Sequence, residues 1–186
     1  TDGDSVGQYV ESNWHTLKFE TEWLAMAAKR RALKMVGYIS SYLEGSNQLV
    51  AIEQGFEIDL GRLVVAGKID RVERTGDGLI AADLKTGKSP SAKETVEHRQ
   101  LALYQLGLRE SYDEPVAGGR IISVGSGSLK VLEQPALAGE FQESIMELLS
   151  RAESQIGEAS FVANISEHCT GDSKCQLLMA KAVTHD

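Results

Sequence analysis

The sequence predicts a single α+β domain, or a mixed α/β sandwich, in which helices surround one β-sheet. Three observations support this fold class. Hydrophobic residues first recur at helical spacing, then follow a strand-like pattern, and then return to helical spacing. The chain has 186 residues, 42% of them apolar, which is enough to bury one core. It contains no internal repeat and no low-complexity tract, which argues against repeat architectures and disorder.

Two helices are expected before the sheet, one over residues 8–17 and a longer one over residues 20–43. In the longer helix, apolar side chains recur at helical spacing with basic residues between them. A Gly-Ser-Asn run at residues 45–47 ends this helix. The apolar residues of the pattern are Trp23, Leu24, Ala27, Leu33, Val36 and Ile39.

The middle of the chain is rich in Val and Ile and predicts an antiparallel meander. The segment Thr75-Gly76-Asp77-Gly78 is typical of a hairpin turn, here between the second and third strands. The elements expected from residue 48 onward are strands at 49–60, 62–74 and 79–86, a helix at 92–110, strands at 118–124 and 129–133, and helices at 137–157 and 174–183.

Composition argues against several classes of function. The formal net charge of -8 argues against a free-standing domain that grips nucleic acid through charge alone. No stretch approaches the roughly 20 apolar residues of a membrane span, and the first ten residues lack the apolar run of a signal peptide. Cys169 and Cys175 are too few for a disulfide framework or a four-cysteine metal site, so we expect a reducing compartment. Because the chain begins at Thr1 without Met, we expect it to be a piece of a longer protein.

Three charged residues of the predicted hairpin, Asp70, Asp83 and Lys85, are candidates for a functional site. If Gly76-Asp77 forms the turn, Asp70 lies opposite Asp83. If Asp77-Gly78 forms the turn, Asp70 lies opposite Lys85. In both registers the three side chains share one face, since side chains alternate along a strand with a period of two residues.

Two carboxylates that converge on one face favour a cation between them, and oxygen ligands suit Mg²⁺ or Mn²⁺. With Lys85 two residues after Asp83, such a site contains the parts for metal-assisted hydrolysis of a phosphodiester. The alternative is a solvated hairpin with an ordinary Asp–Lys pair across the strands.

The next predicted helix presents Gln100 and Tyr104, which are four residues apart and share a helix face. They could bond water, metal-bound groups or a phosphate, and the alternative is an amphipathic helix with a polar shoulder. His98 and Arg99 are either phosphate contacts or surface residues.

An earlier strand carries two further carboxylates, Glu53 and Glu57. They offer a possible further acidic ligand near the metal, or else simply face solvent.

Three motifs occur in order, namely Gly67-x-x-Asp70-Arg71, Asp83-Leu84-Lys85-Thr86-Gly87 and Gln100-x-x-x-Tyr104. Together they resemble the RecB-type nuclease domain of the PD-(D/E)xK superfamily, which lies at the C-termini of helicase–nucleases such as RecBCD, AddAB and AdnAB. The resemblance covers residues 49–108 well. It implies a restriction-endonuclease-like core, a mixed central sheet flanked by helices.

The resemblance also implies a role for each matching residue. Asp70, Asp83 and the backbone carbonyl of Leu84 would bind Mg²⁺ or Mn²⁺. Lys85 would orient the attacking water and offset the developing negative charge. Gln100 and Tyr104 would support the site and contact the DNA backbone.

Two departures from the family pattern matter. The family usually has a metal-binding His on an N-terminal helix, and His15 lacks the surrounding motif, so we expect that motif to lie upstream of residue 1. Several relatives hold an iron–sulfur cluster through four cysteines, and with Cys169 and Cys175 alone we expect no cluster here.

The implied function is metal-dependent DNA hydrolysis by the nuclease module of an ATP-dependent helicase–nuclease in double-strand-break repair and recombination. Its partners would be DNA, an attached helicase domain and a second helicase–nuclease subunit, in the bacterial cytoplasm near the nucleoid and without a membrane. The alternatives are a nuclease-fold module that binds DNA or a partner without cutting, and a nuclease of CRISPR adaptation or phage processing.

We expect residues 1–186 to form one domain. It would consist of a helical lead-in at 1–47, a catalytic sheet and helix at 48–135, and C-terminal helices at 136–186.

Overall fold

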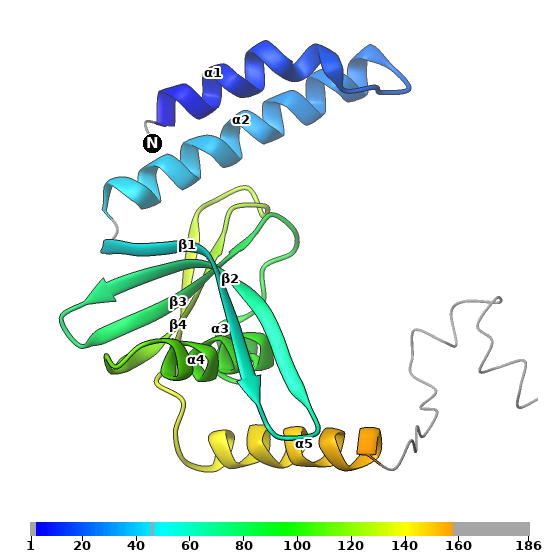
Figure 1. Cartoon of the computed structure of the whole chain (residues 1–186). Helices are drawn as coiled ribbons and strands as arrows, with labels where there is room; N and C mark the ends of the chain where they lie inside the picture. The colour runs from blue at the N-terminus through cyan, green and yellow to red at the C-terminus, as the bar shows by residue number, and fades with distance from the viewer. Residues whose placement is uncertain (1–2, 46, 158–186) are drawn as a thin grey trace, which may run out of the picture.

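The computed structural model of the chain describes residues 3–45 and 47–157, which form one five-stranded sheet with helices around it (Figure 1). Two helices, α1 and α2, precede the sheet and pack against each other as a hairpin. The elements are α1 (Gly3–Asn13), the 3-10 turn η1 (Trp14–Thr16), α2 (Glu22–Glu44), β1 (Gln48–Asp59), β2 (Val64–Thr75), β3 (Gly78–Lys85), α3 (Ala92–Val96), α4 (Arg99–Ser111), β4 (Val116–Ser123), β5 (Lys130–Pro135) and α5 (Gly139–Gly157).

The strands lie side by side in sequence order, β1-β2-β3-β4-β5. The first three form the expected antiparallel meander, β4 runs parallel to β3, and β5 is antiparallel to β4. A parallel pair cannot be closed by a tight turn, so the chain between β3 and β4 crosses the sheet as α3 and α4. The predicted fold class, an α+β domain with a mixed central sheet flanked by helices, is confirmed.

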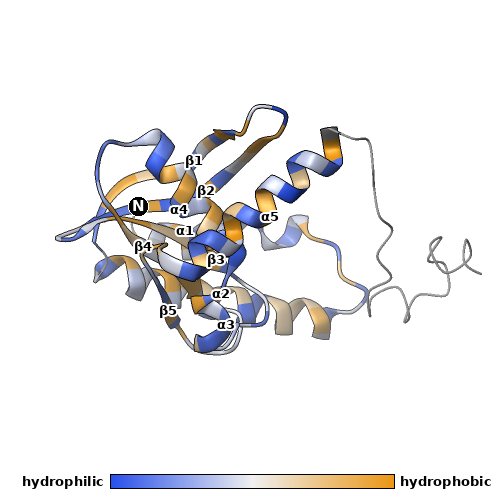
Figure 2. Ribbon diagram, turned by 90° about the horizontal axis from the view of Figure 1, so that it is seen from below, coloured by the Kyte–Doolittle hydropathy of each residue, from blue (hydrophilic) through white to orange (hydrophobic). Residues whose placement is uncertain are grey.

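One face of the sheet packs against α4. Leu101 and Leu108 of α4 are fully buried among the side chains of β1 to β4, including Phe56 and Ile121. Helix α5 joins this side, where Ile145 and Leu149 pack with Ala102 of α4. Figure 2 shows apolar and polar residues alternating along α5, as an amphipathic helix requires.

The other face packs against α2 through both apolar and charged groups. Tyr42 of α2 is buried against Ala82 and Ile122 of the sheet. Its hydroxyl donates to the carboxylate of Glu73, a fully buried residue of β2, at 2.9–3.0 Å. Arg120 of β4 donates to the same carboxylate at 2.9 Å. This network therefore ties α2, β2 and β4 together with every buried charge paired.

Burial, followed by the charge of Glu73, raises the pKa of Tyr42 to about 12, although its bond to Arg120 works in the opposite direction. The neutral phenol therefore stabilises the fold below pH 10. That contribution is lost as the pH rises towards 12.

The single helix predicted over residues 92–110 is wrong in one respect, because two helices, α3 and α4, fill this span. The break falls at Glu97 and His98. The buried side-chain amide of Gln134 on β5 donates to the carbonyls of Thr95, Val96 and His98 at 3.0–3.1 Å. The carbonyl of Val96 thus gains a partner that a continuous helix would have supplied within itself, while those of Thr95 and His98 also accept backbone N–H groups.

Two further predictions concern the C-terminal segment and the absence of a membrane span. The helix predicted at 174–183 and both cysteines lie outside the described residues. Among the described residues, no helix combines the length and apolarity that crossing a bilayer requires.

Two helical glycines offer a matched test of the packing between α4 and β1. A Cβ on Gly107 of α4 would lie 2.4 Å from Cγ of Phe56, whereas a Cβ on Gly37 of α2 would meet nothing within 4 Å. Gly107→Ala should lower the free energy of unfolding by about 1–3 kcal/mol through overpacking. Gly37→Ala should raise it by about 0.5–1 kcal/mol, because alanine is the better helix former. Urea unfolding of both variants measures this, and equal effects would contradict the described packing.

Candidate active site

The β2–β3 hairpin has the first of the two registers that its sequence allows. Thr75 pairs with Gly78, so Gly76-Asp77 is the two-residue turn. Arg71 pairs with Ala82 at the other end of the described pairing. The described pairing ends there, and Asp70 and Asp83 are the next residues of the two strands beyond it.

Asp83 is a buried carboxylate with hydrogen-bonding partners on two elements. It is 2% exposed and leaves β3 on the side covered by α4. Lys85 Nζ lies 2.9 Å from Asp83 Oδ2 and donates to Oδ1 at 3.2 Å. The side-chain amide of Gln100 donates to Oδ1 at 3.1 Å. A buried carboxylate thus obtains a cation from its own strand and a neutral donor from the neighbouring helix.

Gln100 is the hub of the remaining contacts. Its Oε1 accepts from Lys85 Nζ at 3.1 Å, and its Nε2 donates to the Tyr104 hydroxyl at 2.6 Å. Burial raises the pKa of Tyr104, the bond from Gln100 lowers it, and the nearby carboxylates Asp83 and Asp70 raise it again. The structure therefore joins Asp83, Lys85, Gln100 and Tyr104 in one polar cluster.

Asp70, on the adjacent strand, lines a pocket with Tyr42 and Ala82 on the α2 side of the sheet, whereas Asp83 meets α4. Asp70 Oδ2 accepts from the backbone N–H of Leu84 at 2.8 Å, one residue after Asp83. The regular alternation assumed from the sequence is interrupted here, because Ile69 and Val72 both belong to the core on the α4 side. On β1, Glu53 lies between Ile52 and Gln54, which pair with Arg71 and Ile69, and it has a left-handed backbone with φ of 49°. The direction of the Asp70 side chain therefore depends on this local irregularity of β1 and β2 as well as on the usual alternation of side chains along a strand.

The other carboxylates and the early histidine do not enlarge the cluster. Glu53 pairs with Lys68 at 3.7 Å on the surface, and Glu57 and His15 are both exposed. Within residues 3–45 and 47–157, no three His, Cys, Asp or Glu side chains form a group that could hold a metal. A metal here would rely on two carboxylates, backbone oxygen and solvent.

The donor set nevertheless fits a hard divalent cation. Asp83 Oδ2 is buried, accepts no well-aligned hydrogen bond within the described part of the chain, and has Lys85 as its near neighbour. A buried carboxylate oxygen with unused acceptor capacity is costly unless something else binds it. Carboxylate and carbonyl oxygens are the ligands that Mg²⁺ and Mn²⁺ prefer.

His98 and Arg99, which precede Gln100, line different pockets. His98 is half-buried and lines a pocket with Lys85, whereas Arg99 is exposed and lines a different hollow with Glu97 and Glu140. The sequence places His98 and Arg99 side by side and does not distinguish them. The break between α3 and α4, which turns His98 inward, depends on the distant Gln134.

The family comparison agrees with this arrangement of a mixed sheet and a carboxylate–lysine pair on its third strand. The chain belongs to the PD-(D/E)XK nuclease superfamily, whose family model matches residues 2–178.

Two solved structures are similar to the chain. A putative exonuclease from Eubacterium rectale has a TM-score of 0.51 and 10% identity, covering 91% of this chain and 72% of that one. A second protein, SSO0001, has a TM-score of 0.45 and 16% identity, covering 84% of this chain and 70% of that one. No curated protein sequence matches the chain significantly.

The bond between Gln100 and Tyr104 can be tested by titration. Because the Gln100 amide stabilises the phenolate, Gln100→Ala should raise the pKa of Tyr104 further above its ordinary value. NMR of ring-labelled tyrosine measures this value. Gln54→Ala, which removes the hydrogen-bond partner of Tyr112, is the control and should leave Tyr104 unchanged. A Tyr104 pKa that is the same in all three proteins would contradict the described contact.

Proposed function

We propose that this chain is a RecB-type, metal-dependent deoxyribonuclease module. The observation that carries the proposal is the buried Asp83, which is held by Lys85 and Gln100, while Asp70 accepts from the backbone N–H of Leu84, the next residue along β3. The three motifs of the RecB-type domain fall at these positions, and the superfamily match supports nuclease chemistry in general.

In this proposal the metal ligands are Asp70, Asp83 and the backbone carbonyl of Leu84. When bound there, Mg²⁺ or Mn²⁺ would polarise the scissile phosphodiester and lower the pKa of the attacking water. Lys85 lies beside Asp83 Oδ2, where its ammonium group can hold that water and offset the negative charge that develops on the phosphate.

Gln100 and Tyr104 have supporting roles. Gln100 accepts from Lys85 and donates to Asp83, so it fixes the lysine relative to the proposed metal ligand. The Tyr104 hydroxyl oxygen accepts from Gln100, and a phenol whose pKa is raised by burial is protonated at neutral pH, so its O–H is available to donate to a phosphate oxygen of DNA.

The wider setting is also a proposal. We infer that the domain, treated as residues 1–186, works beside a helicase and a second helicase–nuclease subunit, in double-strand-break repair and recombination in the bacterial cytoplasm. The net charge of -8 supports this setting, because an acidic domain gains little affinity for DNA from charge and benefits from a motor that delivers the strand.

A nuclease-fold module that binds DNA or a partner without cutting is the second candidate. The absence of a third His or carboxylate near Asp70 and Asp83, within the residues that the structure describes, favours it. The intact pairing of Lys85 with Asp83 favours cleavage, since a binding module has no need of a buried carboxylate–lysine pair.

The proposal is tested by removing the central carboxylate. Asp83→Ala should reduce Mg²⁺- or Mn²⁺-dependent cleavage of linear DNA at least about a hundredfold, measured in single turnovers with the chain in excess. Asp77→Ala is the matched control, because Asp77 is an exposed aspartate in the turn of the same hairpin. Cleavage by Asp83→Ala at the rate of the control would refute the nuclease assignment. A folded chain that binds DNA and never cuts it would favour the second candidate.

A further inference from the structure

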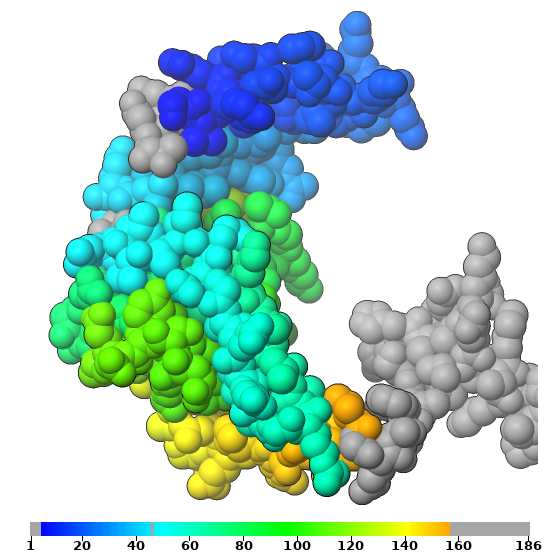
Figure 3. All heavy atoms as spheres, in the orientation of Figure 1, coloured from blue at the N-terminus to red at the C-terminus, as the bar shows by residue number. Residues whose placement is uncertain are grey.

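A pocket of about 240 Å³ adjoins the proposed active site and shares Lys85 with it. A ligand in this pocket would therefore lie next to the reacting centre. Figure 3 shows that the described part of the molecule is hollowed on the side from which the turn after β3 projects. The other residues that line the pocket are Lys88, Ser89, Pro90, Glu94 and His98.

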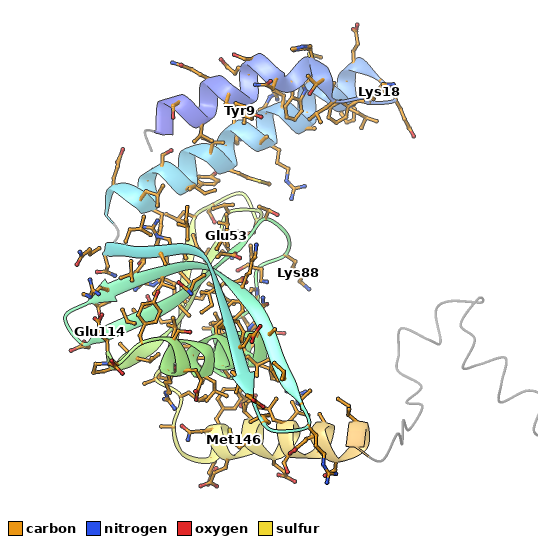
Figure 4. All side chains as sticks on the ribbon, in the orientation of Figure 1. Tyr9, Lys18, Glu53, Lys88, Glu114 and Met146 are labelled. Carbon is orange, nitrogen blue, oxygen red and sulfur yellow. The ribbon has the colours of Figure 1, made fainter. Side chains whose placement is uncertain are left out.

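Lys88 supplies a positive charge that the protein does not use internally. It is exposed and projects outward from the turn after β3 (Figure 4). In the described part of the chain it makes no hydrogen bond and no direct ion pair. At longer range its charge helps to lower the pKa of Glu94. Lysines that cradle phosphates act in this way, as point charges on a flexible stem.

Glu94 is the one acidic residue of the pocket, and it is already engaged. Its carboxylate accepts from the backbone N–H of Ser91 at 2.7 Å in a capping box at the start of α3. This bond is the largest cause of the lowered pKa of Glu94. The carboxylate is thus held at the wall by the start of α3. Lys85 is paired with Asp83, so Lys88 is the lysine of the pocket that has no direct ion pair among the described residues.

His98 contributes an uncharged hydrogen-bonding group. Burial, and then the charge of Lys85, lowers the pKa of His98, so the imidazole is neutral at pH 7. Its Nδ1 is buried without a hydrogen-bond partner among the described residues. The residue is also the N-cap of α4, yet its side chain makes no capping bond, and the first turn of that helix holds no acidic residue. The positive end of the α4 dipole is therefore not neutralised there.

These features together describe a site for a phosphate group. We propose that the pocket binds a phosphate of the DNA backbone next to the one that is cleaved, and that Lys88 and His98 position the strand. A nucleobase is a poorer fit, because the pocket walls include no Phe, Tyr or Trp on which a base could stack. The inference rests on the proposed nuclease function and adds a second phosphate contact to it.

The test pairs protein variants with DNA in which one phosphate is made neutral. Linear duplex oligonucleotides, each with a single methylphosphonate at a different position, are cleaved by the wild-type chain and by Lys88→Ala. The matched control is Lys93→Ala, an exposed lysine of α3 that does not line the pocket. His98→Ala tests the second positioning residue.

For the wild type, one methylphosphonate position near the cut should raise KM roughly tenfold, the loss expected for a hydrogen bond to a charged group. Lys88→Ala should show the raised KM on unmodified DNA, a kcat within about twofold of wild type, and no further loss at that position. His98→Ala should raise KM in the same direction, and Lys93→Ala should behave as wild type.

Two results would overturn this inference and leave the nuclease function intact. One is equal KM values for Lys88→Ala and Lys93→Ala, and the other is a Lys88→Ala variant as sensitive as wild type to every methylphosphonate. A wild-type chain without any Asp83-dependent cleavage would instead refute the nuclease function, and the inference with it.

Discussion

The parallel pairing of β3 with β4 is the constraint on which the candidate site depends. Because parallel neighbours need a crossover, the chain leaves β3, builds α3 and α4 across the sheet, and returns as β4. Helix α4 is thereby placed against the end of β3, where Gln100 meets Asp83 and Lys85. The buried carboxylate of Asp83 is thus held both by Lys85 of its own strand and by Gln100 of this crossover.

The opposite face of the sheet supports the same strands. Glu73 is fully buried beside Tyr42 and Arg120, so β2, β4 and α2 are held by a charged network that leaves its central carboxylate fully paired. Arg71 extends this network, donating to Glu73 at 2.6 Å, and it directly follows Asp70. Strand β2, which carries Asp70, is thus fixed through Glu73 by Tyr42 and Arg120. It is also fixed through Asp70 by the amide of Leu84.

Local sequence signals predicted the meander, the hairpin turn and the motif residues, because turn chemistry and strand periodicity act over a few residues. The interruption of the helix at His98 was not predictable, since it depends on Gln134, which lies 36 residues further along the chain. The irregularity at Asp70 was missed for a similar reason, because the left-handed Glu53 belongs to another strand. Nothing in the local sequence indicated that Glu73 is buried, apart from its position two residues after Arg71, which places both side chains on the same face of the strand.

The central claim is that Asp70 and Asp83 together bind a divalent cation. Isothermal titration of the chain with Mn²⁺ tests this claim without requiring activity. The account predicts one site in the wild-type chain, lost in Asp83→Asn and strongly weakened in Asp70→Asn, with Asp77→Asn unchanged. Equal Mn²⁺ affinity in all four proteins, or no binding by the folded wild-type chain, would contradict it.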